Sequence, residues 1–404
     1  MKLVNGNTYM NDKKTNKVYK YLDRNIETEI LIVGGGITSA ITAWYLAKAG
    51  YSIVIAEKNV LGYGSSRASS ALLDYQAEYM LKDLINEIGE KRAESIYKKS
   101  LESIKDLELI CNEIKTDVEF KILDSVIYTD NKSKISTLEE EYELRKNKGY
   151  DVTLVDKIDS NVMKKCLVTK NASATINPYL FLISVFKYLE KKYNIKIYEN
   201  TRIDNSISNE NAVVSITNND KIITSKHLIL ATGYDAQNNI KDKNTKVYAT
   251  YSIITDKIEN LSRLNINYTA MDLKKPYHFY RFTKDNRILF GGEDILLGNN
   301  KLDSDKMREI SNKKFLKLYE NIKKHFYMIP NIKVKYAYSA VFADTKDTLP
   351  IIDKLPNLDN AYCNLAYGGS GIIYGVIGAK YLKDIIQNNI VSPELEMFEI
   401  NRKI

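Results

Sequence analysis

The stretch EILIVGGGITSAITAWYLAKAGYSIVIAEK, residues 29–58, decides the fold of this chain. An apolar run at residues 30–33 meets three glycines, Gly34 to Gly36, and the apolar residues after them recur at helical spacing. A second apolar run, residues 52–56, ends at the acid Glu57. The pattern predicts a strand, a tight turn, a helix and a second strand, which together form one βαβ unit for a dinucleotide.

Each position in this unit has a physical task. Gly34 allows the turn, and Gly36 lets a pyrophosphate approach the bare backbone at the start of a helix, where unpaired N–H groups and the helix dipole favour anions. Ser39 stands where the motif has its third glycine, which weakens the match. Glu57 is placed to accept the ribose hydroxyls, and no basic residue replaces it for a 2′-phosphate. The alternative is a glycine-rich turn that binds nothing.

Length and composition limit the number of domains and the classes of function that the chain can have. The 404 residues predict two domains, and 44% hydrophobic with 27% charged residues is ordinary for a globular protein. The net charge of +8 comes from lysines scattered among acids, which predicts a solvated surface and no nucleic-acid partner. Three dispersed cysteines and three dispersed histidines predict no disulfide framework and no metal site. No membrane span or signal peptide is apparent, so we expect a cytoplasmic protein.

Three further segments fit a nucleotide site. Residues 61–75 (LGYGSSRASSALLDY) are rich in small and hydroxyl side chains, which suits a phosphate-contacting loop but also a plain polar surface loop. An apolar strand ends at residues 231–233 (ATG), and a strand from residue 361 enters a second glycine turn at residues 368–371. The helix after that turn would direct its positive dipole end at a flavin ring, whereas helix packing alone would explain only its later glycines.

Together with NPYLF (residues 177–181), FYRFTKDNRILFGGED (279–294) and TKDTLPIID (345–353), these motifs resemble the D-amino-acid oxidase superfamily of FAD-dependent oxidoreductases. The likeness is greatest to its glycine oxidase, sarcosine oxidase and γ-glutamylputrescine oxidoreductase-like members. It spans about residues 29–390, nearly the whole chain. The resemblance implies an α/β fold (α+β overall), in which a Rossmann-like FAD-binding domain is joined to a second, mainly antiparallel-sheet substrate domain.

We expect a discontinuous domain organisation. The FAD-binding domain would comprise residues 29–77, 165–246 and 337–404, and the substrate domain residues 78–164 and 247–336. Residues 1–28 would form an extension that lies along the surface or packs against a partner subunit, so a homo-oligomer stays open.

The motifs and the resemblance imply which residues contact FAD. They are Gly34, Gly36, Ile37, Thr38, Glu57, Lys58, Ser65, Ser66, Arg67, Ser70, Ala71, Leu72, Ile203, Thr232, Gly233, Gly368, Gly369, Ser370, Gly371 and Ile372.

For catalysis the resemblance implies an active-site tyrosine at Tyr280, with Arg281 on the opposite strand face. A core aromatic is the other interpretation of Tyr280. Phe342 stands where amino-acid oxidases of this family place the arginine that holds the substrate carboxylate, and Gly369 stands at a second basic position. A carboxylate buried without a cation costs several kcal/mol. This favours a polyamine or a larger secondary amine, unless Arg281 or Arg67 turns inward.

Two other departures concern the flavin and oxygen. Leu289 aligns with the lysine used for oxygen activation, and Ala340 aligns with the cysteine used for covalent flavin attachment. We therefore expect non-covalent FAD, with oxygen or another electron acceptor. The predicted function is oxidation of the C–N bond of an amine or amino acid by hydride transfer to flavin N5, which gives an imine that hydrolyses. The alternative is a flavoprotein subunit that binds FAD for structure or electron transfer without its own turnover.

Overall fold

The computed structural model describes residues 4–9, 18–76, 79–158, 162–234, 245–259, 261–264, 266–297, 304–365 and 367–402. The predicted βαβ unit is present. It consists of strand β2 (Ile26–Val33), helix α1 (Ile37–Lys48) and strand β3 (Ile53–Ala56), and the two strands pair in parallel. Residues 30–33 of β2 are apolar on both faces because helices cover one side and a second apolar layer covers the other.

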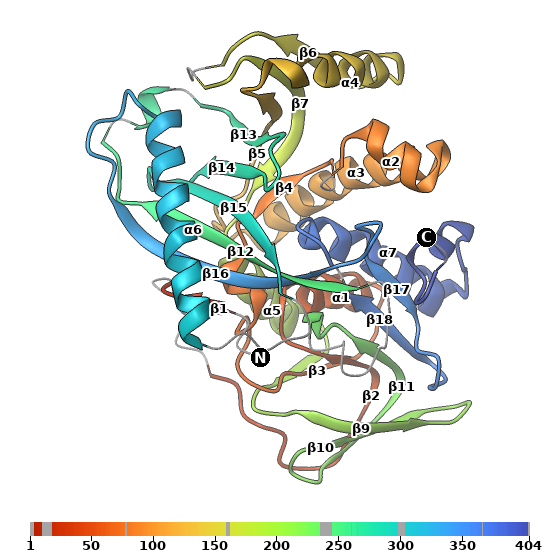
Figure 1. Ribbon diagram of the computed structural model, residues 1–404. Coiled ribbons are helices and arrows are strands. Elements are labelled where there is room, and N and C mark those ends of the chain that lie inside the picture. Colours follow the sequence, from red (N-terminus) through yellow and green to blue (C-terminus); the bar gives the residue numbers. More distant parts are fainter. Residues whose placement is uncertain are drawn as a thin grey trace.

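An eight-stranded sheet is built around this unit (Figure 1). Its other strands are β8 (Ile195–Tyr198), β9 (Ile203–Ser208), β10 (Val213–Thr217), β11 (Ile222–Leu230), β17 (Ile351–Lys354) and β18 (Ala361–Leu365). The order is β17-β18-β11-β2-β3-β8, and β10 joins β11 to β9. Pairing is parallel from β18 to β8, so the carboxyl ends of these strands meet at one edge. In open parallel sheets that edge is where ligands bind.

A second, ten-stranded sheet lies above the first in Figure 1. It contains β1 (Val4–Gly6), β4 (Leu72–Asp74), β5 (Lys121–Thr129), β6 (Val152–Val155), β7 (Lys165–Thr175), β12 (Lys246–Thr255), β13 (Tyr268–Asp272), β14 (His278–Phe282), β15 (Ile288–Leu296) and β16 (Val334–Asp344). The order is β1-β16-β12-β15-β14-β13-β5-β7-β4, with β6 on β7. Within this sheet only β13 and β5 pair in parallel, among the described strands. The predicted mainly antiparallel sheet is therefore present.

The remaining helices are α2 (Leu81–Ile88), α3 (Glu90–Ile114), α4 (Ile135–Asn147), α5 (Pro178–Lys192), α6 (Ser304–His325) and α7 (Gly371–Asn388), with short 3-10 turns η2 (Ser65–Ala68), η3 (Lys132–Lys134), η5 (Leu261–Leu264) and η6 (Pro393–Phe398). Helix α1 packs against α5 and α7, and α6 covers the outer face of the ten-stranded sheet (Figure 1). Helices α2 and α3 are separate because Gly89 takes a φ of +84° between them. The Asn177 side chain caps α5 by accepting the Leu180 N–H at 3.1 Å.

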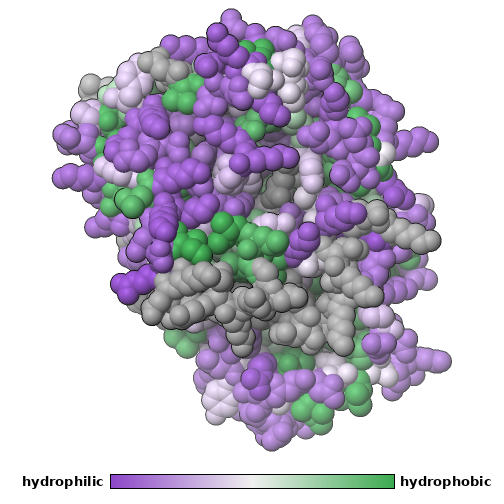
Figure 2. All heavy atoms as spheres, in the orientation of Figure 1, coloured by the Kyte–Doolittle hydropathy of each residue, from purple (hydrophilic) through white to green (hydrophobic). Residues whose placement is uncertain are grey.

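The boundaries of the two predicted domains stay a proposal. Strands β4, β7 and β16 belong to the ten-stranded sheet, although most of their residues fall within ranges expected for the FAD-binding domain. The N-terminal segment is also more integrated than a surface leader, since β1 pairs with β16 and Leu22 is fully buried. Figure 2 shows mainly hydrophilic side chains on one face, with apolar ones near its centre. Within the described parts of the chain, no helix has the length and apolarity to cross a bilayer.

Candidate active site

The glycine turn after β2 is shaped for close approach to the backbone. Gly34 has a φ of +111°, and a Cβ there would lie 2.5 Å from the Ala231 carbonyl oxygen, so only glycine fits. Gly36 is the N-cap of α1 and has no side chain of its own to cap the helix, while the Ile37 N–H of the first turn is bonded to Ser66 Oγ. A Cβ on Gly36 would meet only the Ser66 Oγ, at 3.3 Å. The start of α1 therefore presents backbone donors and a positive dipole end beside open space, which suits a phosphate.

Glu57 closes the other side of this turn. Its Oε2 accepts the Gly35 N–H at 2.6 Å and its Oε1 accepts the Asn59 N–H at 2.7 Å. An ionised carboxylate offers about four lone-pair sites and can accept several hydrogen bonds at once. Glu57 thus lies beside the glycine turn at the edge of the cavity, and its ribose contact stays a prediction.

The serine-rich loop docks onto the same helix start. Ser66 Oγ accepts the Ile37 N–H at 3.1 Å, and Ser69 Oγ accepts the Ala71 N–H at 3.1 Å. Ala71 has a φ of +48°, which fixes the bend that leads into β4. Behind the loop, Arg281 Nε donates to the Ser70 carbonyl oxygen. The loop is thus held from both sides with its backbone facing the cavity.

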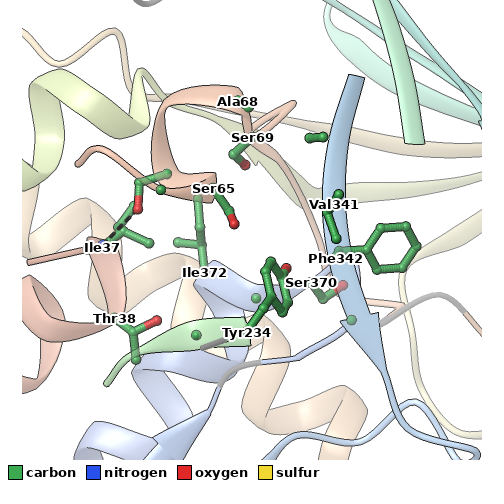
Figure 3. A pocket seen from close by; sticks show the side chains of 18 of the residues that line it. Ile37, Thr38, Ser65, Ala68, Ser69, Tyr234, Val341, Phe342, Ser370 and Ile372 are labelled. Carbon is green, nitrogen blue, oxygen red and sulfur yellow. Dashed lines mark hydrogen bonds between the residues drawn. The ribbon is translucent and has the colours of Figure 1, made fainter. Parts of the chain in front are cut away.

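A second helix N-terminus reaches the same space. Gly368 has a φ of +80°, and its N–H donates to the Ala343 carbonyl oxygen at 2.8 Å, which ties the C-terminal turn to β16. Helix α7 follows with Ser370 as an N-cap whose side chain makes no capping bond. Figure 3 shows Ser370, Ile372 and Tyr234 between the start of α1 and β16. Two positive helix ends therefore converge on one cavity.

This cavity has a volume of about 1310 Å³, above the roughly 300–1,000 Å³ typical of pockets for drug-sized ligands. Its lining includes every residue predicted to contact FAD: Gly34, Gly36, Ile37, Thr38, Glu57, Lys58, Ser65, Ser66, Arg67, Ser70, Ala71, Leu72, Ile203, Thr232, Gly233, Gly368, Gly369, Ser370, Gly371 and Ile372. Residues from five separate parts of the chain thus meet in one place. The volume and the two helix ends fit a dinucleotide with room for a second molecule.

The ten-stranded sheet forms the far wall of the cavity. Thr250 and Ser252 of β12, Met271 of β13, Phe279 of β14 and residues 340–342 of β16 line it. The Phe342 ring stacks on Tyr248, with centroids 5.5 Å apart and planes at 22°. It extends from β16 in the direction away from Ile37 and Thr38 (Figure 3). This wall is mostly apolar.

The structure places Tyr280 and Arg281 outside the cavity lining. Tyr280 is 1% exposed and packs on Phe290 and Phe326 in the core between the sheet and α6. Arg281 does lie on the opposite face, as strand alternation requires, but its side chain is buried behind the serine-rich loop. The position of Tyr280 gives no support to its predicted catalytic role, and Phe279, its neighbour on the other face, lines the cavity instead.

A buried ionic cluster fixes the strands of this wall. His278 Nδ1 lies 2.9 Å from Asp272 Oδ2, and its Nε2 lies 2.9 Å from Glu293 Oε1. Lys314 and Lys317 of α6 reach Glu293 at 2.9 and 2.7 Å. Burial acts to raise the pKa of Glu293, but hydrogen bonds from these lysines and His278 hold it below its usual value. The cluster joins β13, β14, β15 and α6, and Asp272 also borders the cavity.

Sequence reasoning missed the polar residues Asp74 and Gln76, which line the cavity and are 7% and 4% exposed. The available signal was an acid two positions after Leu72, because alternate residues of a strand share a face.

Comparisons with known proteins identify the family of the chain. Residues 29–385 match the family model described as "FAD dependent oxidoreductase". A protein of Bacillus subtilis (strain 168) named for a Rieske 2Fe-2S iron-sulfur centre is 22% identical over 371 residues, which cover 91% of this chain and 70% of that protein. Gamma-glutamylputrescine oxidoreductase of Escherichia coli (strain K12) is 21% identical over 382 residues, covering 91% and 85%. The structure of glycine oxidase from Geobacillus kaustophilus has a similar fold, with a TM-score of 0.77, 15% identity and coverage of 94% and 99%. The chain therefore belongs to this family of FAD-dependent oxidoreductases, and FAD is its cofactor.

Proposed function

We propose that this chain oxidises the C–N bond of an amine or amino acid. The observation that carries the proposal is the single cavity that joins a nucleotide cradle to a wall of the ten-stranded sheet. The cradle holds the cofactor, and the remaining space, beside a mostly apolar wall, accommodates a substrate. Names of related proteins, gamma-glutamylputrescine oxidoreductase and glycine oxidase, support an amine or amino-acid substrate.

When bound, FAD supplies the acceptor for a hydride from the substrate carbon. In this reaction the carbon loses a hydride, the nitrogen loses a proton, and the resulting imine reacts with water. The protein residues bind and orient: the starts of α1 and α7 hold negative charge, and the apolar wall with Phe279 and Val341 excludes water. The dipole of α7 favours negative charge that develops on the cofactor side of the cavity.

Within this class we propose an amine without a carboxylate beside the reacting carbon. Phe342 stacks on Tyr248, and Arg281 is engaged with the Ser70 carbonyl outside the cavity lining. Arg67 does line the cavity, but its guanidinium lies over the Tyr63 ring, 4.4 Å from the centroid. Position 342 itself therefore offers no cation to a substrate carboxylate, and burying a carboxylate without one costs several kcal/mol. Among the described lining residues, Lys274 and Lys275 follow β13 rather than lying on β16.

A second candidate is an electron-transfer subunit without substrate turnover. The relative named for a Rieske centre favours it, because that name implies one-electron chemistry next to a flavin fold. The two candidates share the cofactor and differ in whether a small amine reduces it.

Anaerobic reduction separates the candidates. The purified yellow protein is mixed without oxygen with a panel of primary amines, secondary amines and amino acids, and the flavin absorbance is followed. Bleaching by an amine supports the proposed enzyme. A protein that dithionite bleaches but no panel member reduces would contradict it and favour the electron-transfer subunit. Peroxide formation on readmitting air then distinguishes an oxidase from a dehydrogenase.

A further inference from the structure

Two buried acceptor side chains border the substrate end of the cavity. Asp74 ends β4, and Gln76 follows in the next turn. Leu72, a predicted FAD contact, shares the strand face of Asp74, at a distance of about 7 Å along a strand. Both Asp74 and Gln76 line the cavity and are almost completely buried. The pair is therefore close to Leu72, a predicted flavin contact.

A hydrogen-bond network fixes how these side chains point. Ser125 Oγ donates to Asp74 Oδ2 at 2.7 Å, and Gln76 Nε2 donates to Ser125 Oγ at 2.8 Å. Because the serine hydroxyl has one proton and gives it to the carboxylate, it must accept from the amide nitrogen. The Gln76 Oε1 is thus turned the other way. It is buried, and within the described residues it has no hydrogen-bond partner.

The charge of Asp74 is also unmatched by direct contact. No lysine, arginine or histidine of the described chain forms an ion pair with it. The positive charge of Arg145 acts to lower the pKa of Asp74, but the Arg145 guanidinium is itself bonded to Glu141 and Tyr75. Burial raises the pKa of Asp74, while bonds from Ser125 and Gln76 act in the opposite direction. An uncompensated buried acceptor costs about 1–3 kcal/mol, more when charged, unless a ligand satisfies it.

We propose that Asp74 and Gln76 form the recognition site for the cationic amino group of an alkylammonium substrate. This inference rests on the proposed function and narrows it. An ammonium nitrogen carries several N–H donors, so it can bond to the carboxylate and to the amide oxygen together while its charge meets that of Asp74. An anionic ligand group would be repelled from the same corner. Asp74 and Gln76 thus select for a cationic amine over neutral or acidic molecules of equal size.

The test measures binding and turnover separately. FAD-loaded protein is titrated with butylamine, and with 1-butanol as a neutral probe of similar size, while the flavin spectrum is followed without oxygen. Wild-type protein is expected to bind butylammonium more tightly than butanol. Asp74→Asn should weaken butylammonium binding about 10- to 150-fold, the range expected for losing a charge-assisted hydrogen bond of roughly 1.5–3 kcal/mol, with butanol affinity unchanged. Gln76→Met should weaken ammonium binding by a smaller factor, and it carries the test where Asp74→Asn does not fold.

Asp124→Asn is the matched control, because Asp124 adjoins Ser125 but lies outside the cavity lining. It should change neither affinity. Equal loss of butylammonium and butanol affinity in the Asp74 variant, or no change in either, would overturn the inference, as would a wild-type protein that does not prefer the ammonium. If wild-type protein binds butylammonium selectively but no amine bleaches the flavin, the proposed enzyme fails while the binding site stands. If amines bleach the flavin and Asp74→Asn leaves the KM for the amine unchanged, the proposed enzyme stands and the binding site at Asp74 and Gln76 fails.

Discussion

Gly36 allows the fold and the cofactor site to be tested separately. Its backbone, with φ of −92° and ψ of −176°, suits alanine as well as glycine, and the added Cβ would touch only Ser66 Oγ at 3.3 Å. Gly36→Ala should therefore change the free energy of unfolding of the apoprotein by less than about 1 kcal/mol. The same methyl group would project toward the predicted phosphate contact at the start of α1.

The expected loss is in FAD affinity. Inserting a methyl group into a fitted contact costs about 1–3 kcal/mol, which raises the Kd for FAD roughly 5- to 150-fold. Reconstitution of apoprotein followed by quenching of flavin fluorescence gives the Kd, and urea unfolding of the apoprotein gives its stability.

Gly375→Ala is the matched control. Its Cβ would make ordinary contacts with Thr38 Oγ1 at 3.6 Å and Ile41 at 3.7 Å, and Gly375 lies outside the cavity lining. It should leave the Kd unchanged and stabilise α7 by up to about 1 kcal/mol. A Gly36 variant that binds FAD within twofold of wild type would refute the placement of the phosphate site. If Gly36→Ala lowers the free energy of unfolding of the apoprotein by as much as it lowers the binding free energy of FAD, the claim that fold and cofactor site can be tested separately would be refuted.

Three other perturbations test the framework. Arg145→Met removes the cation that lies 2.6 Å from the buried Glu141 carboxylate. The free energy of unfolding in urea should therefore fall by about 3–5 kcal/mol, and a fall of less than about 1 kcal/mol would contradict a role for this pair in stability. Burial, together with neighbouring acids, raises the pKa of Asp344 from 3.8 to about 7, so the native state keeps a proton that the unfolded state releases between about pH 4 and 7. The free energy of unfolding of the wild type should therefore fall as the pH rises through that window. At pH 8, Asp344→Asn should be more stable than the wild type by at most about 4 kcal/mol, at 1.36 kcal/mol per pKa unit. A stability difference between the two proteins that is the same at pH 4 and pH 8 would contradict this. Gly378→Ala would put a Cβ 2.3 Å from the buried Asn364 Oδ1, so we expect a loss of about 1–3 kcal/mol and a lower Tm, and an unchanged Tm would show that Asn364 can move.

The nucleotide cradle was predictable because every step of it is written within about thirty residues. The residues of the ten-stranded sheet that line the cavity were not predictable, because alternation along a strand does not say which of its two faces is which. In β14 both strand faces are buried, so alternation separates Tyr280 from Arg281 but does not say which face meets the cavity. The ionic pair of Glu141 and Arg145 was hidden as well, since a charged helix of i and i+4 pairs usually faces water, whereas both side chains here are fully buried. Long-range pairing, as of β1 with β16, leaves no local signal in a three-residue strand.

The order of strands in the eight-stranded sheet also constrains how the cofactor can be acquired during synthesis. Strands β2 and β3 are complete by residue 56, but β11 ends at Leu230 and β18 at Leu365, and the start of α7 comes later still. At about 5–20 residues per second, a ribosome needs roughly 15–60 s to make the 310 or so residues between β3 and the end of β18. The outer edges of β3 and β2 can pair once β8 and β11 have been made, but the edge of β11 that pairs with β18 stays open until residue 365. Such an exposed apolar strand edge is a target for chaperones. FAD can be enclosed by both helix ends only once nearly the whole chain has been made, so loading is a late, post-translational step and C-terminally truncated chains should emerge colourless.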